Sequence, residues 1–232
     1  MSEVAEQPSN ISVLRKAKLL SSLPDNLLME LAGQSKMALA QRTEVIWLHG
    51  MQVDFFGVVG TGFVKMTRPV THGQDITTEL MGPGQIFGLL GVVDGHGCPQ
   101  AAKAVSETWF LKVPKHAIRP ILGSHHELNQ VLVDRTSGRL RRAFDRIARM
   151  TTGMVEDRIA SVILLLCESY AVEEGDVIHL NIPLTRQDIA EMAGTTVEST
   201  IRVISRWQKE GIVESTRKRL SILEMSRLEA MI

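Results

Sequence analysis

Residues 184–213, LTRQDIAEMAGTTVESTIRVISRWQKEGIV, contain two short amphipathic segments joined by a single glycine, and this arrangement constrains the fold more than any other stretch. Thr185 is expected to cap the first helix through its hydroxyl group, with Asp188 as the acidic partner three residues later. Gly194 is expected to form the turn, because a positive φ costs glycine little. Three side chains of this first helix are expected to point inward: Ile189, Ala190 and Ala193.

The second helix follows the turn directly and ends near Gly211. Its apolar spacing predicts three inward side chains: Ile201, Ile204 and Trp207. Two helices joined by a glycine turn form a helix-turn-helix, whose second helix inserts its N-terminal residues into the major groove of DNA. The segment therefore predicts an element that reads DNA.

Glu198 and Arg202 lie one turn apart on the same face of this second helix. A carboxylate accepts a hydrogen bond from cytosine N4, and a guanidinium donates two to guanine O6 and N7, so the pair is suited to a G·C step. The alternative is an ordinary surface ion pair between the two side chains, which is common in helices. The preceding helix and the glycine turn favour base reading.

A basic hairpin is expected after the second helix, because IVESTRKRLSIL alternates and turns at its basic centre. Arg217 and Lys218 are expected to contact DNA phosphates, and a solvated loop is an equally good interpretation. The net charge of the chain is zero, which argues against indiscriminate coating of nucleic acid. Any basic surface is therefore local.

Short apolar runs punctuated by glycine extend from about Val45 to Val113 and predict an antiparallel β sandwich or barrel. A long helical pattern follows Pro120 and ends before Gly153, a candidate hinge. Its apolar stripe is expected to meet a copy of itself in a homodimer, with packing on its own barrel as the alternative. The stripe comprises Leu128, Leu132, Thr136, Leu140, Ala143, Ile147 and Met150.

Several classes of site have no support in the sequence. The two cysteines, Cys98 and Cys167, lie far apart, which argues against disulfides, zinc sites and iron–sulfur clusters. No adjacent cation activates Cys98, so a passive thiol is a better interpretation than a redox switch. No Ser-His-Asp, paired-carboxylate or Walker spacing occurs, so catalytic and metal-binding residues are not expected. The chain also lacks a signal peptide and an apolar membrane span, which predicts a cytoplasmic location.

These motifs, in this order, resemble those of the bacterial regulators related to the cyclic-AMP receptor protein (CRP) and the fumarate and nitrate reduction regulator (FNR). The phrases that carry the resemblance are GTGFVKM, MGPGQIFG, DRIASVILLL and the helix-turn-helix segment. The resemblance implies an α+β fold. Its parts would be a cyclic-nucleotide-binding-like β-roll (1–124), a dimerisation helix with a hinge (125–152) and a winged helix-turn-helix domain (153–232).

The resemblance also implies how the protein would contact its partners. The expected partners are double-stranded DNA with an inverted-repeat operator, a second copy of the chain, and RNA polymerase. A ligand-binding or protein-interaction module without DNA selectivity is the alternative, against which Arg202 and the basic hairpin argue. The residues expected at DNA phosphates are Thr185, Arg186 and Gln187, and those expected at the bases are Glu198, Ser199 and Arg202, with Thr196 beside them.

The effector is where this sequence departs from the family. Cyclic-nucleotide binders carry a glutamate where Leu89 stands and an arginine motif where Pro99 and Gln100 stand, so cyclic AMP is not expected. The N-terminal cysteine cluster of the oxygen-sensing branch is also missing. Haem held by a histidine, a small metabolite and no effector at all are the alternatives, so the cofactor stays unassigned. The expected pocket comprises Phe87, Gly88, Leu89, Leu90, Gln100, Ala101 and Ala102.

Overall fold

The computed structural model describes residues 6–70, 75–175, 177–216 and 219–232, without the side chains of residues 146 and 149–152. The chain forms two compact units, Met1–Leu140 and Arg141–Ile232. One long helix, α5 (His126–Thr152), continues across the boundary between them. The three-part division expected from the sequence stays a prediction.

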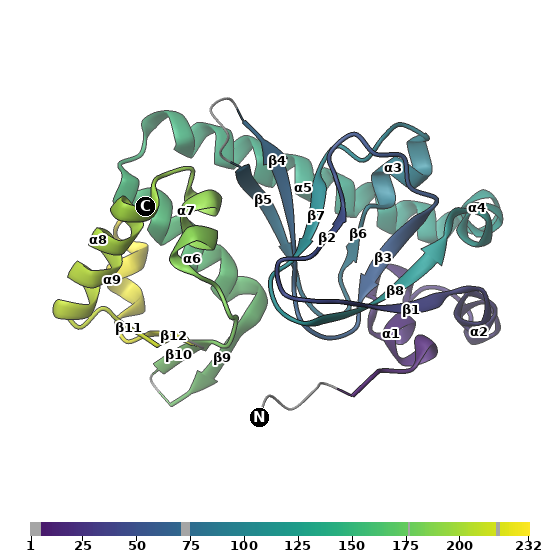
Figure 1. Ribbon diagram of the computed structural model, residues 1–232, viewed down its shortest axis with the longest axis horizontal. Coiled ribbons are helices and arrows are strands. Elements are labelled where there is room, and N and C mark those ends of the chain that lie inside the picture. Colours follow the sequence, from purple (N-terminus) through teal and green to yellow (C-terminus); the bar gives the residue numbers. More distant parts are fainter. Residues whose placement is uncertain (1–5, 71–74, 176, 217–218) are drawn as a thin grey trace. The chain divides into compact units, whose positions relative to one another are not determined.

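The N-terminal unit contains two four-stranded sheets, in the orders β1-β8-β3-β6 and β2-β7-β4-β5 (Figure 1). Every pair of neighbouring strands in them is antiparallel, which confirms the expected β-roll. The strands are β1 (Lys36–Ala40), β2 (Val45–Trp47), β3 (Phe55–Val59), β4 (Val64–Pro69), β5 (Asp75–Met81), β6 (Ile86–Phe87), β7 (Ala101–Ala104) and β8 (Thr108–Pro114).

Short helices pack against the first of these sheets. Apolar side chains of the N-terminal helices, of α4 and of the start of α5 share one buried cluster with Phe56, Val58 and Leu111. The helix α2 begins directly after Pro24. The helices of this unit before α5 are α1 (Asn10–Lys16), η1 (Lys18–Leu20), α2 (Asp25–Gln34), α3 (Leu89–Asp94) and α4 (Lys115–Ser124).

The long helix α5 has 27 residues, and its stripe serves two purposes. Leu128 is 1% exposed and Leu132 packs against the same buried cluster, so the start of the stripe covers its own unit. The assignment of Leu128 to a dimer interface is therefore wrong, because its side chain is already buried within one chain. Further along, Leu140 and Ile147 are exposed, and their assignment to a dimer interface stays a prediction.

The middle and the end of the stripe are exposed wherever the side chains are described. Thr136 is exposed, and its hydroxyl donates a hydrogen bond to the Leu132 carbonyl oxygen at 2.8 Å. Ala143 is exposed too, whereas the side chain of Met150 lies outside the described part of the chain. Phe144, which the predicted stripe omitted, is 60% exposed and lies between Leu140 and Ile147 on the same face.

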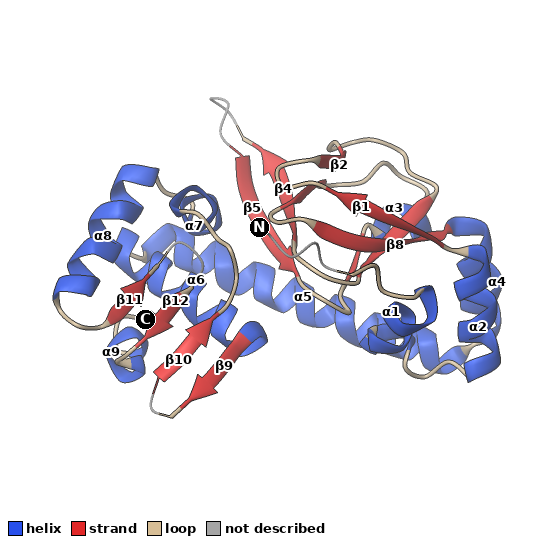
Figure 2. Ribbon diagram, turned by 60° about the horizontal axis from the view of Figure 1, so that its bottom comes forward, coloured by secondary structure: helices blue, strands red, loops and turns tan. Residues whose placement is uncertain are grey.

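The C-terminal unit combines the helices α6 to α9 with a four-stranded antiparallel sheet in the order β11-β12-β10-β9 (Figure 2). Gly153 and Met154 separate α5 from α6. Among the described residues, no helix has the length and apolar character needed to cross a bilayer. The elements are α6 (Val155–Tyr170), β9 (Ala171–Glu174), β10 (Val177–Leu180), α7 (Arg186–Ala193), α8 (Val197–Lys209), β11 (Val213–Ser215), β12 (Leu220–Ile222) and α9 (Met225–Glu229).

Candidate nucleic-acid interface

The first helix of the predicted helix-turn-helix is α7, and its ends are built as expected. The Asp188 amide donates to Thr185 Oγ1 at 3.1 Å, and the Thr185 amide donates to Asp188 Oδ2 at 2.8 Å, which completes a capping box. Gly194 ends the helix with φ of 60° in the left-handed region. The expected inward residues Ile189, Ala190 and Ala193 are all buried. The local sequence therefore predicted the start, the end and the buried face of α7 correctly.

The second helix, α8, begins at a separate cap. Thr196 Oγ1 accepts a hydrogen bond from the Ser199 amide at 3.2 Å, and the two hydroxyl groups lie 3.1 Å apart. Ser199, expected to face bases, is half-buried and tied to this cap. The helix is held to its unit by one buried face, which consists of Thr200, Val203, Ile204 and Trp207.

Ile201 does not belong to this buried face, so its predicted inward position is wrong. Its side chain is 47% exposed. The buried residues of α8 follow the spacing i, i+3, i+4, i+7 from Thr200, and this spacing places Ile201 outside the stripe. The sequence prediction failed because an apolar residue beside a buried stripe fits the same periodicity roughly as well.

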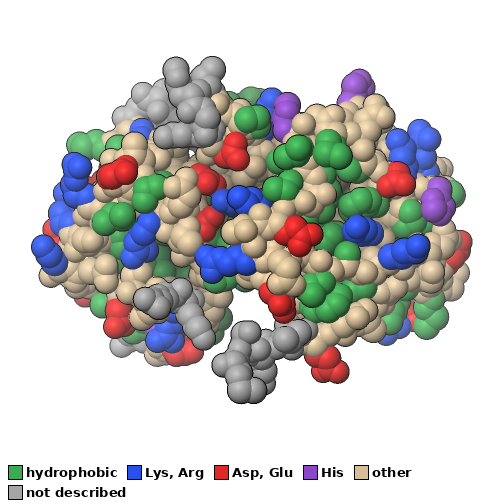
Figure 3. Space-filling model, viewed as in Figure 1, with side chains coloured by type: hydrophobic (Ala, Val, Ile, Leu, Met, Phe, Trp, Pro, Cys, Tyr) green, Lys and Arg blue, Asp and Glu red, His purple; other side chains and the backbone are tan. Residues whose placement is uncertain are grey.

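Glu198 and Arg202 both lie exposed on the outer side of α8. Within the described part of the chain, no hydrogen bond or ion pair engages either side chain, so the alternative of a mutual ion pair is not formed. Lys and Arg side chains gather over α8 on the face that Figure 3 shows. The outer side of α8 therefore presents one carboxylate and one guanidinium in a basic setting, with their hydrogen-bonding groups available.

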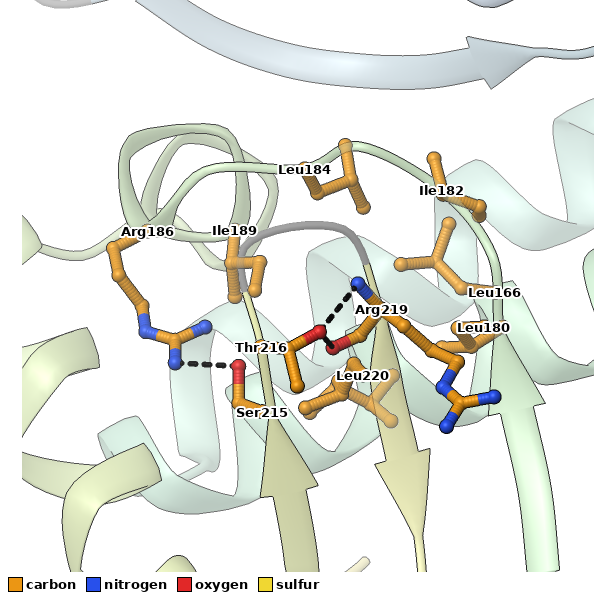
Figure 4. Close-up of a pocket in the computed structure, with 11 residues that line it drawn as sticks. Leu166, Leu180, Ile182, Leu184, Arg186, Ile189, Ser215, Thr216, Arg219 and Leu220 are labelled. Carbon is orange, nitrogen blue, oxygen red and sulfur yellow. Dashed lines mark hydrogen bonds between the residues drawn. The ribbon is translucent and has the colours of Figure 1, made fainter.

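Arg186, at the start of α7, reaches across to β11. Its Nη2 donates to Ser215 Oγ at 2.8 Å (Figure 4). Burial lowers the pKa of this guanidinium, which nevertheless stays charged. Thr185 is exposed, and so is Gln187, whose amide donates to Glu191 Oε1 at 3.0 Å. The three residues expected at phosphates therefore lie together at the N-terminus of α7, where a helix end favours anions.

The hairpin between β11 and β12 is present, as the alternating sequence predicted. The Thr216 amide donates to the Arg219 carbonyl oxygen at 2.9 Å, and the Arg219 amide donates to Thr216 Oγ1 at 3.2 Å. Arg217 and Lys218, the predicted phosphate contacts at its tip, lie outside the described residues. Their assignment stays a prediction.

Two residues at the start of α6 hold the helix-turn-helix in place, and sequence patterns did not predict either of them. Glu156 accepts hydrogen bonds from Trp207 Nε1, at 2.6 Å, and from the Arg206 guanidinium. Arg158 Nε donates to the Ala193 carbonyl oxygen at 3.1 Å. Glu156 is thus a positioning residue for α8, and it lies three residues after the candidate hinge at Gly153.

Glu156→Gln is expected to lower the free energy of unfolding by about 1 kcal/mol at neutral pH, because two donors lose a charged acceptor. Burial would raise the pKa of Glu156, but the hydrogen bonds from Arg206 and Trp207 outweigh it and leave the pKa below 4.5. A lowered pKa stabilises the folded state above pH 4.5 and loses that effect as the pH falls through the folded value. Urea unfolding from about pH 6 to about pH 3 should therefore show the gap between wild type and variant closing. A gap that is constant over this range contradicts the role of the carboxylate.

The predicted effector pocket lies in the N-terminal roll, whose interior is filled with aromatic side chains. Trp47 stacks on Phe87 with ring centroids 5.2 Å apart, and the Phe110 ring packs against Phe87 in a tilted arrangement with centroids 5.7 Å apart. The Phe87 ring closely covers Gly57, where an added Cβ would lie 2.1 Å from it. At Gly88, whose φ is 78°, an added Cβ would lie 2.6 Å from the Trp47 ring. Trp47 was missed because it lies forty positions from Phe87 in the sequence.

The other predicted pocket residues divide into two groups. Gln100, in the loop before β7, joins the interior: its amide donates to Thr78 Oγ1 and its carbonyl oxygen accepts from Trp47 Nε1. The assignment of Leu89 and Leu90 to the pocket is wrong. Leu89 packs against the helical cluster outside the roll, and Leu90 is 55% exposed. Ala101 and Ala102 lie on β7, and Ala102 is fully buried.

One ion pair joins the roll to α5. Glu79 lies opposite Met66 in the β4–β5 ladder, on the face that lines the roll, and its carboxylate pairs with Arg139. Opposite residues of an antiparallel pair point to the same face, so Glu79 brings a charge to the rim of the aromatic interior. Arg139 is therefore already engaged inside its own chain.

The histidines and cysteines form no metal site in the described part of the chain. Burial raises the pKa of the Cys98 thiol, and the negative charge of Asp94 raises it further, which agrees with a passive thiol. Four of the sensor-half histidines are exposed: His49, His96, His116 and His126. His125 is half-buried beside the Ile121 carbonyl oxygen, and His72 lies outside the described residues.

Two family models match the chain. The model described as a cyclic nucleotide-binding domain matches residues 40–125, and the model described as a Crp-like helix-turn-helix domain matches residues 157–231. Together the matched ranges cover well over half of the sequence. They coincide with the β-roll and with the unit that carries α7 and α8.

Known proteins resemble the chain over most of its length. It is 22% identical to the CRP-like cAMP-activated global transcriptional regulator of Mycobacterium tuberculosis, over 93% of this chain and 96% of that protein. It is 25% identical to the global nitrogen regulator of Synechocystis sp., over 78% of this chain and 81% of that one. The structure of FixK2 from Bradyrhizobium japonicum matches with a TM-score of 0.76 at 23% identity, covering 85% of this chain and 96% of that chain. At this identity the structural likeness shows the fold.

Proposed function

We propose a function from one premise: the chain belongs to the CRP/FNR family of transcription regulators, with a sensor domain and a helix-turn-helix domain. On that premise the protein acts in the cytoplasm as a homodimer that recognises an inverted repeat in double-stranded DNA and influences transcription through RNA polymerase. Regulators of this family are not enzymes, and no catalytic residue is assigned.

The observation that carries the proposal is the outer side of α8. Glu198 and Arg202 are exposed on a helix that is capped at Thr196 and anchored by Trp207, so both are presented on a rigid element. A carboxylate and a guanidinium one turn apart match the donor of cytosine and the acceptors of guanine in the major groove. Arg186, at the N-terminus of α7, would contact the phosphate backbone beside them.

Four exposed apolar side chains of α5 support the homodimer. Val133, Leu140, Phe144 and Ile147 are between 54% and 63% exposed, and their spacing of seven, four and three residues follows a coiled-coil seam. Such a contiguous apolar stripe is costly in water, and a second copy of the same helix covers it through a self-complementary interface. A dimer of this kind would place two copies of α8 about 34 Å apart, one turn of DNA.

The signal sensed by the roll is proposed not to be a cyclic nucleotide. A cyclic phosphate needs a charge-assisted partner, and Arg139, which reaches the rim of the interior from α5, is engaged by Glu79. Trp47 stacks on Phe87 within the roll, and both side chains belong to its buried interior cluster. A small metabolite, or no effector, fits this packed interior better than haem, which requires a large pocket and an axial ligand.

Selection from a random pool of double-stranded DNA tests the proposal. The purified protein is expected to enrich an inverted repeat whose half-sites lie about one helical turn apart and contain a G·C step. Its affinity should fall steeply as the salt concentration rises, because phosphate contacts release counterions. Recovery of a pool with no sequence preference would instead support a protein-interaction module that retains the helix-turn-helix only as a scaffold.

A further inference from the structure

Ile201 is the one large apolar side chain of α8 that is exposed, at 47%. It lies between Glu198 and Arg202, three residues after the first and directly before the second. The buried face of the helix is formed by Val203, Ile204 and Trp207, and Ile201 lies outside it with about half of its side chain open to solvent. An exposed isoleucine on the surface that would meet DNA therefore needs a partner outside the chain.

The position of Ile201 restricts what that partner is. A side chain flanked by two base-reading residues faces the same groove as they do, since positions three and four apart share a helix face. Base edges in the major groove are otherwise polar, and the C5-methyl group of thymine is their one apolar feature. A β-branched side chain has one strongly preferred rotamer in a helix, which suits a fixed contact of this kind.

We propose that Ile201 packs against a thymine methyl group and so specifies an A·T pair next to the G·C step read by Glu198 and Arg202. The inference rests on the proposed function, because it requires α8 to enter the major groove. It adds a specificity determinant that acts by apolar contact and not by hydrogen bonding. Removing the methyl group from the DNA should therefore have the same effect as removing the side chain from the protein.

The test replaces each thymine of the selected operator, one at a time, by deoxyuridine, which lacks only the methyl group. For the wild-type protein, replacing the thymine at one position in each half-site should lower the affinity about fourfold, because the contact loses one buried methyl group. Ile201→Ala should bind the unmodified operator more weakly by a similar factor or more, and should no longer distinguish thymine from deoxyuridine at that position. Ile201→Val, which keeps the branched carbon, should retain most of the discrimination.

Leu223→Ala is the matched control, because Leu223 is an exposed apolar residue of the same unit, at 39%, that lies outside α8. This variant should keep the full response of the wild type to deoxyuridine. The inference is overturned if the wild type tolerates deoxyuridine at every position, or if Ile201→Ala remains as sensitive as the wild type. In both cases the selected operator still stands, so these results differ from a failure of the proposed function, in which no operator is enriched.

Discussion

Replacing Phe144 by glutamate is expected to convert the protein into a monomer and to lower its affinity for an inverted repeat about a hundredfold. Phe144 is 60% exposed in one chain and lies between Leu140 and Ile147 on the outward stripe of α5. In a symmetric dimer the new carboxylate would lie close to its own copy, and two like charges would lose water at an apolar interface. Light scattering during size-exclusion chromatography measures the mass, and a mobility shift on the selected operator measures the affinity.

Arg142→Glu provides the control for this experiment. Arg142 is exposed two residues from Leu140, which places it on the opposite side of α5 from the stripe. The Arg142→Glu substitution introduces the same side chain as Phe144→Glu into the same helix, so the helix propensity of the new residue is matched. The variant should stay dimeric, with at most a modest loss of affinity. A dimeric Phe144→Glu protein would show that the second copy covers another surface, and the expected half-site spacing would then lose its basis.

The features that the sequence predicted correctly are those set by neighbours along the chain. The capping box of Thr185 and Asp188 spans three residues, and the turn at Gly194 depends on the backbone of one residue. Propensity and hydrogen-bonding capacity at such short range are properties of the local sequence, so a pattern is enough to place them. The β-roll followed similarly from short apolar runs that glycines interrupt.

The wrong predictions concern whether an apolar side chain is buried within its own chain or exposed on the surface. The periodicity of α5 located the stripe, but it could not show that Leu128 packs inside its own unit whereas Leu140 faces outward. Ile201 failed for the same reason at a smaller scale, because it adjoins the buried stripe of α8 without belonging to it. Hydrophobic spacing identifies the apolar face of a helix. Which residues of that face are buried depends on the packing of the surrounding chain.

The missed residues are those whose partners are remote in sequence. Glu156 and Trp207 are 51 positions apart, and Arg139 and Glu79 are 60 apart. No composition or spacing rule links positions at such distances in a single sequence, because tertiary packing brings them together. The same holds for Trp47, whose contact with Phe87 decides how much space the roll leaves for an effector.

Arg202→Ala is expected to weaken binding to the selected operator by about 1 to 3 kcal/mol per half-site and to relax the preference at one base pair. Arg202 is exposed, and among the described residues it has no partner within the chain, so its removal leaves the fold unchanged. The loss should therefore appear in base discrimination and not in stability. Repeating the DNA selection with the variant identifies the relaxed position, and thermal unfolding measures the stability.

Two further variants separate base reading from simple attraction to DNA. Lys209→Ala removes an exposed cation from the end of the same helix and should weaken binding to all sequences alike. Arg202→Lys keeps the charge but loses the two-pronged guanidinium, so it should retain the salt dependence of the wild type and lose the base preference. If Arg202→Lys selects the same operator as the wild type, then Arg202 acts only as a charge. In that case Glu198 and Ile201 would have to supply the specificity of α8.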